Sequence, residues 1–130
     1  MLPPIAKTLH QLQGTRYPFL ADVGCGSGLS GSVLTEYGFP WVGVDVSKNM
    51  VRLAQVTTGC RGRICLGDVA CGLPLRRGCL DGAVSISVLQ WLCAAADPEA
   101  AINRFMQSLH GAMRPGACAA LQVYVEGKAA

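Results

Sequence analysis

The chain has 130 residues and a formal net charge of +3, with 51% hydrophobic and 15% charged residues. This composition excludes a disordered chain and is typical of one domain around one packed core. No apolar run reaches the roughly 18 residues that a membrane span needs, and the start of the chain lacks the layout of a secretory signal. We therefore expect no membrane association.

The seven cysteines form no C-x-x-C pair, and the two histidines lie far from them in the sequence. This spacing is not that of a zinc site. An odd number of cysteines without a secretory signal also argues against a disulfide framework. We expect reduced, mostly buried thiols and no metal site in this chain.

Short apolar runs alternate with helical segments, which is the pattern of a parallel α/β sheet. In chain order we expect a helix at 4–13, a strand at 18–23, a helix at 29–37, a strand at 41–46, a helix from 47 to about 56, strands at 63–67 and 80–88, a helix that starts at 97 and is ended by Arg114-Pro115-Gly116, and a strand at 117–125. These elements predict a single α/β domain over residues 1–130, built on a doubly wound, mostly parallel sheet. Such sheets usually continue past a fifth strand, so we expect the domain to be incomplete at its C-terminus.

The apolar spacing also assigns buried faces to two of these helices. The helix at 29–37 is expected to bury Leu29, Val33, Leu34 and Tyr37. The helix capped by Asp97 is expected to bury Ile102, Phe105, Met106, Leu109 and Met113.

A glycine-rich turn, Asp22-Val23-Gly24-Cys25-Gly26-Ser27-Gly28, follows the first predicted strand. Glycines let the backbone turn sharply and approach a ligand closely, and N–H groups at the start of the next helix can receive a carboxylate or a phosphate. Gly26, Gly28 and Gly31 also satisfy G-x-G-x-x-G, and Asp45 stands near the position of a ribose-binding acid. An NAD(P)-dependent oxidoreductase therefore stays an alternative.

Three acids at the carboxyl ends of three successive strands favour a different nucleoside ligand. Asp22 suits the ammonium and sulfonium groups of S-adenosylmethionine, whereas it would repel a pyrophosphate. Asp45 can accept both ribose hydroxyls, and Asp68 can accept the adenine amino group while the Val69 N–H donates to a ring nitrogen. Ligands of open α/β sheets bind at the carboxyl ends of the strands, so we expect the three acids to line one crevice.

With these residues in place, the chain resembles the class I (Rossmann-like) S-adenosylmethionine-dependent methyltransferases. It resembles the small-subunit (18S) rRNA guanine-N7 methyltransferase family more narrowly in three places. These are residues 24–31 followed by 41–47, Leu66-Gly67-Asp68 followed by 72–75 and 80–82, and Ser85-Ile86-Ser87-Val88-Leu89-Gln90-Trp91-Leu92-Cys93. Many related methyltransferases have His-Trp where this chain has Gln90-Trp91.

The resemblance implies S-adenosyl-L-methionine as the cofactor. The residues expected to bind it are the acids and their neighbours, together with two serines that end the fourth strand: Asp22, Gly24, Cys25, Gly26, Gly28, Asp45, Val46, Asp68, Val69, Ser85 and Ser87. Guanine N7 has a lone pair and no proton, so no catalytic acid or base is expected, and neither Cys25 nor Cys93 is expected to be a nucleophile. Gln90 is expected to position the base by a hydrogen bond and Trp91 by stacking, although they could also be a local cap and a packing residue.

The resemblance further implies the substrate, the partner and the place of action. The substrate would be a guanosine of small-subunit rRNA in the pre-ribosome, and several arginines between residues 52 and 77 could face RNA. The partner would be a small zinc-binding methyltransferase activator at the edge of the third strand, near Arg63 and Leu66. We expect action in the nucleus (nucleolus and nucleoplasm) and the cytoplasm. A methyltransferase of the same fold that acts on tRNA or a small molecule, and a non-catalytic ribosome-assembly scaffold, remain alternatives.

Overall fold

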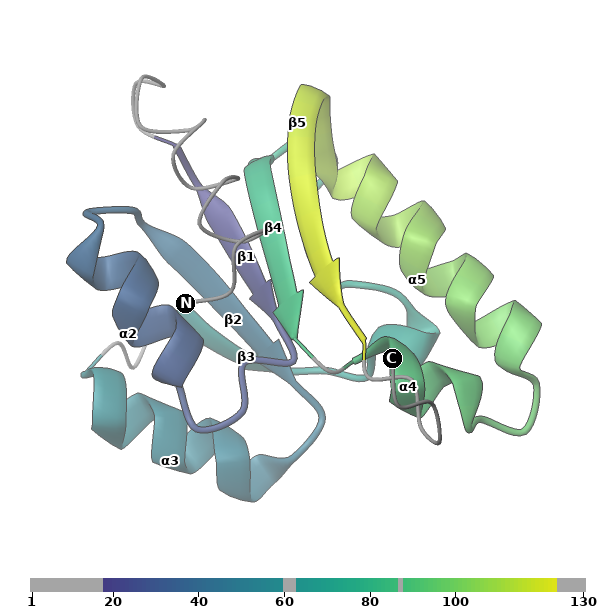
Figure 1. Cartoon of the computed structure of the whole chain (residues 1–130), viewed down its shortest axis with the longest axis horizontal. Coiled ribbons are helices and arrows are strands. Elements are labelled where there is room, and N and C mark those ends of the chain that lie inside the picture. Colours follow the sequence, from purple (N-terminus) through teal and green to yellow (C-terminus); the bar gives the residue numbers. More distant parts are fainter. Residues whose placement is uncertain (1–17, 60–62, 87, 124–130) are drawn as a thin grey trace, which may run out of the picture.

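The computed structural model describes residues 18–59, 63–86 and 88–123, and Figure 1 gives their arrangement. The elements in chain order are β1 (Leu20–Val23), α2 (Leu29–Glu36), β2 (Trp41–Asp45), α3 (Lys48–Thr58), β3 (Ile64–Leu66), the 3₁₀ helix η2 (Val69–Cys71), β4 (Leu80–Ile86), α4 (Leu89–Cys93), α5 (Pro98–Ala112) and β5 (Met113–Gln122). The helix predicted at 4–13 lies outside the described residues.

The five strands form one sheet in the order β3-β2-β1-β4-β5, and all four pairings are parallel. The chain therefore winds outward from β1 to β3 and then returns to the other side of β1 for β4. This reversal confirms the doubly wound α/β sheet and makes the carboxyl ends of β1 and β4 the switch point at which such sheets bind ligands.

Helices cover both faces of the sheet, and each face has its own hydrophobic cluster (Figure 1). On one face, Leu34 of α2 and Ala54 of α3 contact a cluster around Trp41. On the other face, Phe105 and Leu109 of α5 belong to a cluster that contains the alternate residues of β1, β2 and β4. Residues on both faces of β1, β2 and β4 are buried, because helices cover both sides of the middle of a parallel sheet.

The start of β5 differs from the prediction. The helix ends at Ala112 and the strand begins at Met113, which pairs with Leu80, whereas a strand was predicted only from residue 117. The strand is irregular there, since the next pair is Gly82 with Cys118. The residue before a proline favours an extended backbone, so Arg114 and Pro115 join the strand instead of a separate loop.

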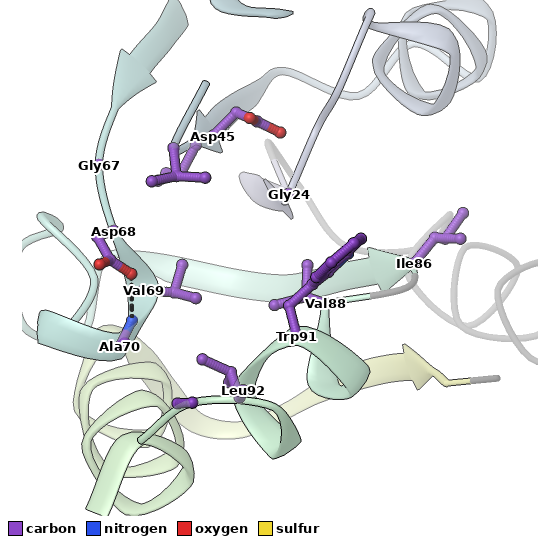
Figure 2. A pocket seen from close by; sticks show the side chains of 13 residues that line it. Gly24, Asp45, Gly67, Asp68, Val69, Ala70, Ile86, Val88, Trp91 and Leu92 are labelled. Carbon is purple, nitrogen blue, oxygen red and sulfur yellow. Dashed lines mark hydrogen bonds between the residues drawn. The ribbon is translucent and has the colours of Figure 1, made fainter. Parts of the chain in front are cut away.

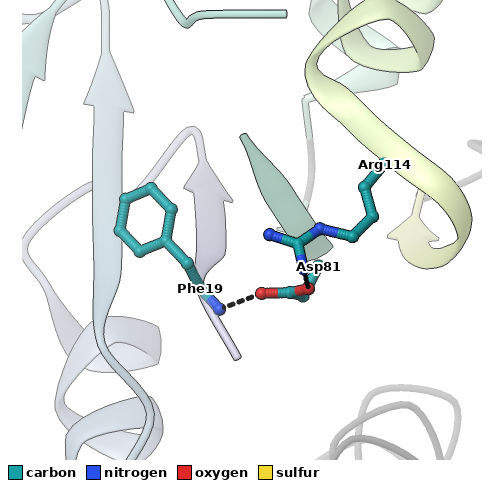
Figure 3. Close-up of polar contacts among 3 residues, drawn as sticks. All are labelled: Phe19, Asp81 and Arg114. Atoms are coloured by element: carbon teal, nitrogen blue, oxygen red, sulfur yellow. Dashed lines mark hydrogen bonds and ion pairs between the residues drawn. The ribbon is translucent and has the colours of Figure 1, made fainter. Parts of the chain in front are cut away.

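A buried acid holds this irregular part of the sheet (Figure 3). The Asp81 carboxylate accepts a hydrogen bond from the Phe19 N–H at 2.7 Å and pairs with the Arg114 guanidinium at 3.1 Å. Asp81 is almost fully buried whereas Arg114 is half exposed. Asp81 and its two partners therefore connect the beginnings of β1, β4 and β5. This end of the sheet is opposite the switch point.

Several predictions about burial are wrong. Leu29 is 72% exposed and Tyr37 is 43% exposed, because α2 contacts the sheet mainly through Gly31 and Leu34. Met106 is exposed as well, so the buried stripe of α5 is narrower than predicted. Of the six described cysteines, all are free, but only Cys25 is buried, and three of them are exposed. The prediction of mostly buried thiols is therefore wrong for the described cysteines.

No helix among the described residues is long and apolar enough to cross a membrane.

Candidate functional site

A cavity of about 640 Å³ lies at the carboxyl ends of the strands, at the switch point of the sheet (Figure 2). It is lined by the ends of β2 and β4, the glycine turn after β1, the segment that leads into η2, and α4. The lining residues are Gly24, Val44, Asp45, Val46, Gly67, Asp68, Val69, Ala70, Ile86, Val88, Trp91, Leu92 and Ala95.

The glycine turn forms one side of this cavity, and its backbone requires glycine. The N–H groups of Gly24 and Cys25 both donate to the Val44 carbonyl, at 2.7 and 3.1 Å, so the turn is fixed to β2. Gly24 has φ +71°, and a Cβ there would meet the side chain of Val88. Gly28, with φ +93°, leads directly into α2. A ligand in the cavity can therefore approach the backbone of the turn closely.

Asp45 and Asp68 stand on the rim, and backbone groups support both carboxylates. Asp45 Oδ2 accepts from the Gly26 N–H and Oδ1 from the Ser47 N–H, both at 2.9 Å. Asp68 Oδ1 accepts from the Ala70 N–H at 3.0 Å and so caps η2. Asp45 is the last residue of β2, Asp68 stands two residues after the adjacent β3, and Figure 2 shows both acids at the cavity. Their positions agree with the predicted crevice.

Asp22 lies behind the cavity and does not line it. It is 1% exposed, and its Oδ2 has no hydrogen-bond partner among the described residues. Burial and, to a lesser extent, the nearby charge of Asp45 raise the pKa of Asp22 from 3.8 to about 7. The residue is buried because β1 is the central strand, paired on both sides with β2 and β4. Two of the three predicted acids therefore line the crevice, and the third lies beneath the glycine turn.

A second buried polar atom without a described partner lies on the neighbouring strand. Ser85 of β4 is 1% exposed, and its Oγ has no hydrogen-bond partner among the described residues. Ser85 pairs in register with Val23, next to Asp22. Asp22 Oδ2 and Ser85 Oγ thus lie on paired strands at the switch point, each without a partner among the described residues, whereas buried polar atoms are normally hydrogen-bonded.

The opposite wall of the cavity is apolar and comes from α4, a helix that we did not predict. Trp91 is 72% exposed at the cavity, and Val88, Leu92 and Ala95 form the wall beneath it. These last three residues are spaced four and three positions apart, which is a helical period. That spacing was a signal for the helix and for this wall.

The predicted site residues are distributed as follows. The residues that line the cavity are Gly24, Asp45, Val46, Asp68, Val69 and Trp91. Those that do not line it are Asp22, Cys25, Gly26, Gly28, Ser85 and Gln90. Ser87 lies outside the described residues. Cavity residues that we did not predict include Val44, Gly67, Ala70 and Ile86.

The ionisable groups in the cavity are few. Asp45 and Asp68 are the ionisable side chains among the lining residues. Burial and the nearby charges of Asp22 and Asp45 raise the pKa of the Cys25 thiol to about 12, so this cysteine stays protonated and is not a nucleophile at neutral pH. Among the described residues, no group of three histidine, cysteine or acidic side chains could hold a metal ion.

Comparisons with known proteins identify the family. Residues 21–120 match the family described as "Methyltransferase domain". The curated 18S rRNA (guanine-N(7))-methyltransferase of Arabidopsis thaliana is 46% identical over 112 residues, which are 83% of this chain and 38% of the relative. The mouse protein of that name is 44% identical over 83% of this chain and 40% of its own length. The chain therefore spans about two fifths of the length of the curated relatives that it matches.

Solved structures have the same fold. A protein titled as an S-adenosylmethionine-dependent methyltransferase of Methanosarcina mazei superimposes with a TM-score of 0.72 at 21% identity, over 93% of this chain and 57% of that one. A methyltransferase of Haloferax volcanii, solved in complex with the Trm112 methyltransferase activator, gives 0.67 at 23% identity, over 88% and 50% of the two chains. Both likenesses confirm the Rossmann-like methyltransferase fold.

Proposed function

The chain belongs to the family of methyltransferase domains, and from this premise we propose that it is part of an S-adenosylmethionine-dependent methyltransferase that modifies guanine N7 in small-subunit rRNA. The observation that carries the proposal is the cavity at the switch point, where Asp45 and Asp68 stand beside a glycine turn and face an apolar wall. The names of the curated relatives support the substrate.

The described residues fit S-adenosylmethionine at both of its ends. Asp45 would hold the ribose hydroxyls, and Asp68 with Val69 would hold the adenine edge, since these residues line the cavity. The unpartnered Oδ2 of Asp22 and Oγ of Ser85 would serve the cationic methionine end. Gly24 would let this end approach the backbone. When bound, the cofactor supplies a methyl group on a positively charged sulfur.

The acceptor that suits this cavity is an atom with a lone pair and no proton. The ionisable side chains of the lining residues are Asp45 and Asp68, and both are hydrogen-bonded to backbone N–H groups on the cofactor side. A general base for a hydroxyl or an amine acceptor is therefore missing among the lining residues. Guanine N7 needs none, and an exposed indole such as Trp91 offers a face on which a base can stack. Rate enhancement would come from alignment of donor and acceptor.

Calorimetry with S-adenosylhomocysteine and with NAD⁺ tests the cofactor, since binding of NAD⁺ alone would favour the oxidoreductase instead.

Methyl transfer from labelled S-adenosylmethionine is then measured on small-subunit rRNA fragments, on tRNA, and on the same rRNA made with 7-deazaguanine. We expect label in the rRNA and none in the 7-deaza form. Methyl transfer to tRNA alone would mean that the substrate is tRNA and not rRNA. Cofactor binding without any methyl transfer would favour a ribosome-assembly scaffold.

We also infer that a small zinc-binding activator of the Trm112 kind pairs with the edge of β3. This strand is one of the two edge strands of the sheet, and Leu66 on it is exposed. Met50 and Leu53 of the neighbouring α3 are exposed as well, which adds apolar surface beside the strand. Arg63, just before β3, was expected at the same interface. Such a partner, and a role in pre-ribosome methylation, would place the protein in the nucleus.

Co-expression with the activator tests this interface. We expect a Leu66→Lys variant to lose co-purification, because a lysine would place a charge in an apolar contact. Met106→Lys is the matched control, because Met106 is similarly exposed on α5, away from β3. Equal recovery of the activator with both variants would contradict the β3 interface.

A further inference from the structure

Helix α5 supports the cavity wall that carries Asp68. Arg104, exposed on this helix, donates from Nε to the Ala70 carbonyl at 2.7 Å. One turn later, Ser108 Oγ accepts from the Leu73 N–H at 2.9 Å and donates to the Phe105 carbonyl at 3.0 Å. Residues four positions apart lie on the same helix face, so two polar side chains of α5 hold the segment that includes η2.

The peptide groups of Ala70 are fixed on both sides. Its N–H donates to Asp68 Oδ1 and its carbonyl accepts from Arg104. The intrinsic bonds of η2 are few, from the Cys71 N–H to the Asp68 carbonyl and from the Gly72 N–H to the Val69 carbonyl. A single 3₁₀ turn is weak on its own. Its position, and with it the direction of the Asp68 carboxylate, therefore depends on α5.

We propose that Arg104 is a positioning residue of the adenosine end of the cavity, acting through Ala70 on Asp68. The inference rests on the proposed function, because it requires adenosine beside Asp68. A guanidinium suits this task, since a hydrogen bond from a charged donor is roughly twice as strong as a neutral one. Ser108 extends the same support to Leu73.

The same helix also supports the other wall. α4, which carries Trp91 and Leu92, contacts α5, as does η2. The segments on either side of the cavity thus rest on one helix, which fixes the distance between them. A substitution on the face of α5 that contacts η2 should therefore alter the adenosine contacts without altering Asp22, which lies on the central strand β1.

Two ligands separate the two ends of the site by calorimetry. S-adenosylhomocysteine has both ends, whereas 5′-methylthioadenosine lacks the amino-acid end. Arg104→Met keeps an aliphatic side chain but removes the donor, and we expect about tenfold weaker binding of both ligands. Arg104→Lys keeps a charged donor and should restore part of the affinity. Gln107→Met is the control that should bind as the wild type does, because Gln107 is exposed on the same helix.

We expect Asp22→Asn to affect the binding of the two ligands unequally, unlike Arg104→Met. It should weaken S-adenosylhomocysteine and leave 5′-methylthioadenosine unchanged, since the residue serves the methionine end. Ser108→Ala gives a second test of the support, with about threefold weaker binding of both ligands expected from the loss of a neutral hydrogen bond. Ser108→Ala also tests the support by α5 if the Arg104→Met variant does not fold.

The outcomes separate the inference from the proposed function. If Arg104→Met and Ser108→Ala bind both ligands as the wild type does, or only melt at a lower temperature, the positioning role is wrong while the cofactor site stands. A loss of S-adenosylhomocysteine without a loss of 5′-methylthioadenosine would also overturn it. If the wild type binds neither ligand, the proposed function itself fails.

Discussion

The rim of the cavity and the buried end of β1 place the same kind of side chain in opposite environments. On the rim, Asp45 and Asp68 accept hydrogen bonds from backbone N–H groups. Beneath the glycine turn, Asp22 is buried, one of its oxygens has no partner among the described residues, and its pKa rises to about 7. All three acids therefore stand near strand ends, but only Asp22 is buried without a partner for one of its oxygens, and this burial raises its pKa.

The raised pKa of Asp22 makes the free energy of unfolding depend on pH. An acid whose pKa is higher in the folded state than in the unfolded state binds its proton more tightly when folded. The unfolded chain then binds fewer protons between the two values, so stability decreases as the pH rises from about 4 to about 7. The buried carboxylate at higher pH needs a cation, which a ligand with an ammonium group would supply.

The largest expected effect comes from Asp22→Asn, which removes the buried ionisable group and so the difference between Asp22 and the acids on the rim. Without ligand, we expect the variant to be more stable than the wild type above pH 7, by as much as about 4 kcal/mol, and equally stable below pH 4. Urea unfolding at pH 4 and pH 8 measures this. Glu99→Gln is the control, because Glu99 is exposed on α5. A variant with the same pH slope as the wild type would show that Asp22 does not titrate in this range.

Gly24→Ala disturbs the turn that separates the two environments. The new Cβ would meet Val88 and would occupy a backbone with φ +71°, so we expect a loss of about 3 kcal/mol of stability from strain and overpacking. Gly26→Ala is the matched control, since it also has a positive φ of +53° but no atom within 4 Å of the added Cβ. It should lose only about 1 kcal/mol. Equal losses in thermal unfolding would mean that the contact with Val88 is unimportant.

Asp45→Ala tests the rim and has the smallest expected effect. It removes the acceptors of the Gly26 and Ser47 N–H groups as well as the proposed ribose contacts. We expect S-adenosylhomocysteine to bind about 1–3 kcal/mol more weakly. Asp45→Asn, which keeps one acceptor oxygen, should lose less. Unchanged affinity in calorimetry would refute the assignment of Asp45.

Much of the site could be predicted because its signals are local. The glycines of the turn have positive φ values, and Asp45 and Asp68 stand at or just after the ends of adjacent strands. The order of residues therefore already places these two acids at one end of a parallel sheet. α4 was missed because it is a five-residue helix, too short for its apolar period to stand out from the strand before it. Leu29 and Tyr37 were expected to be buried because they share the apolar period of α2. The expectation failed because an apolar period does not tell how much of a helix the sheet covers.

The sequence by itself determined the parallel sheet, the glycine turn and the identity of the acids at the strand ends, because backbone preferences and apolar periods act between near neighbours in the chain. The tertiary structure alone decided that Asp22 lies beneath the cavity, that Asp81 joins Phe19 to Arg114, and that Arg104 holds Ala70. Each of these contacts joins residues more than 30 positions apart or depends on how deeply the central strand is covered. Such contacts follow from packing, which no local pattern encodes.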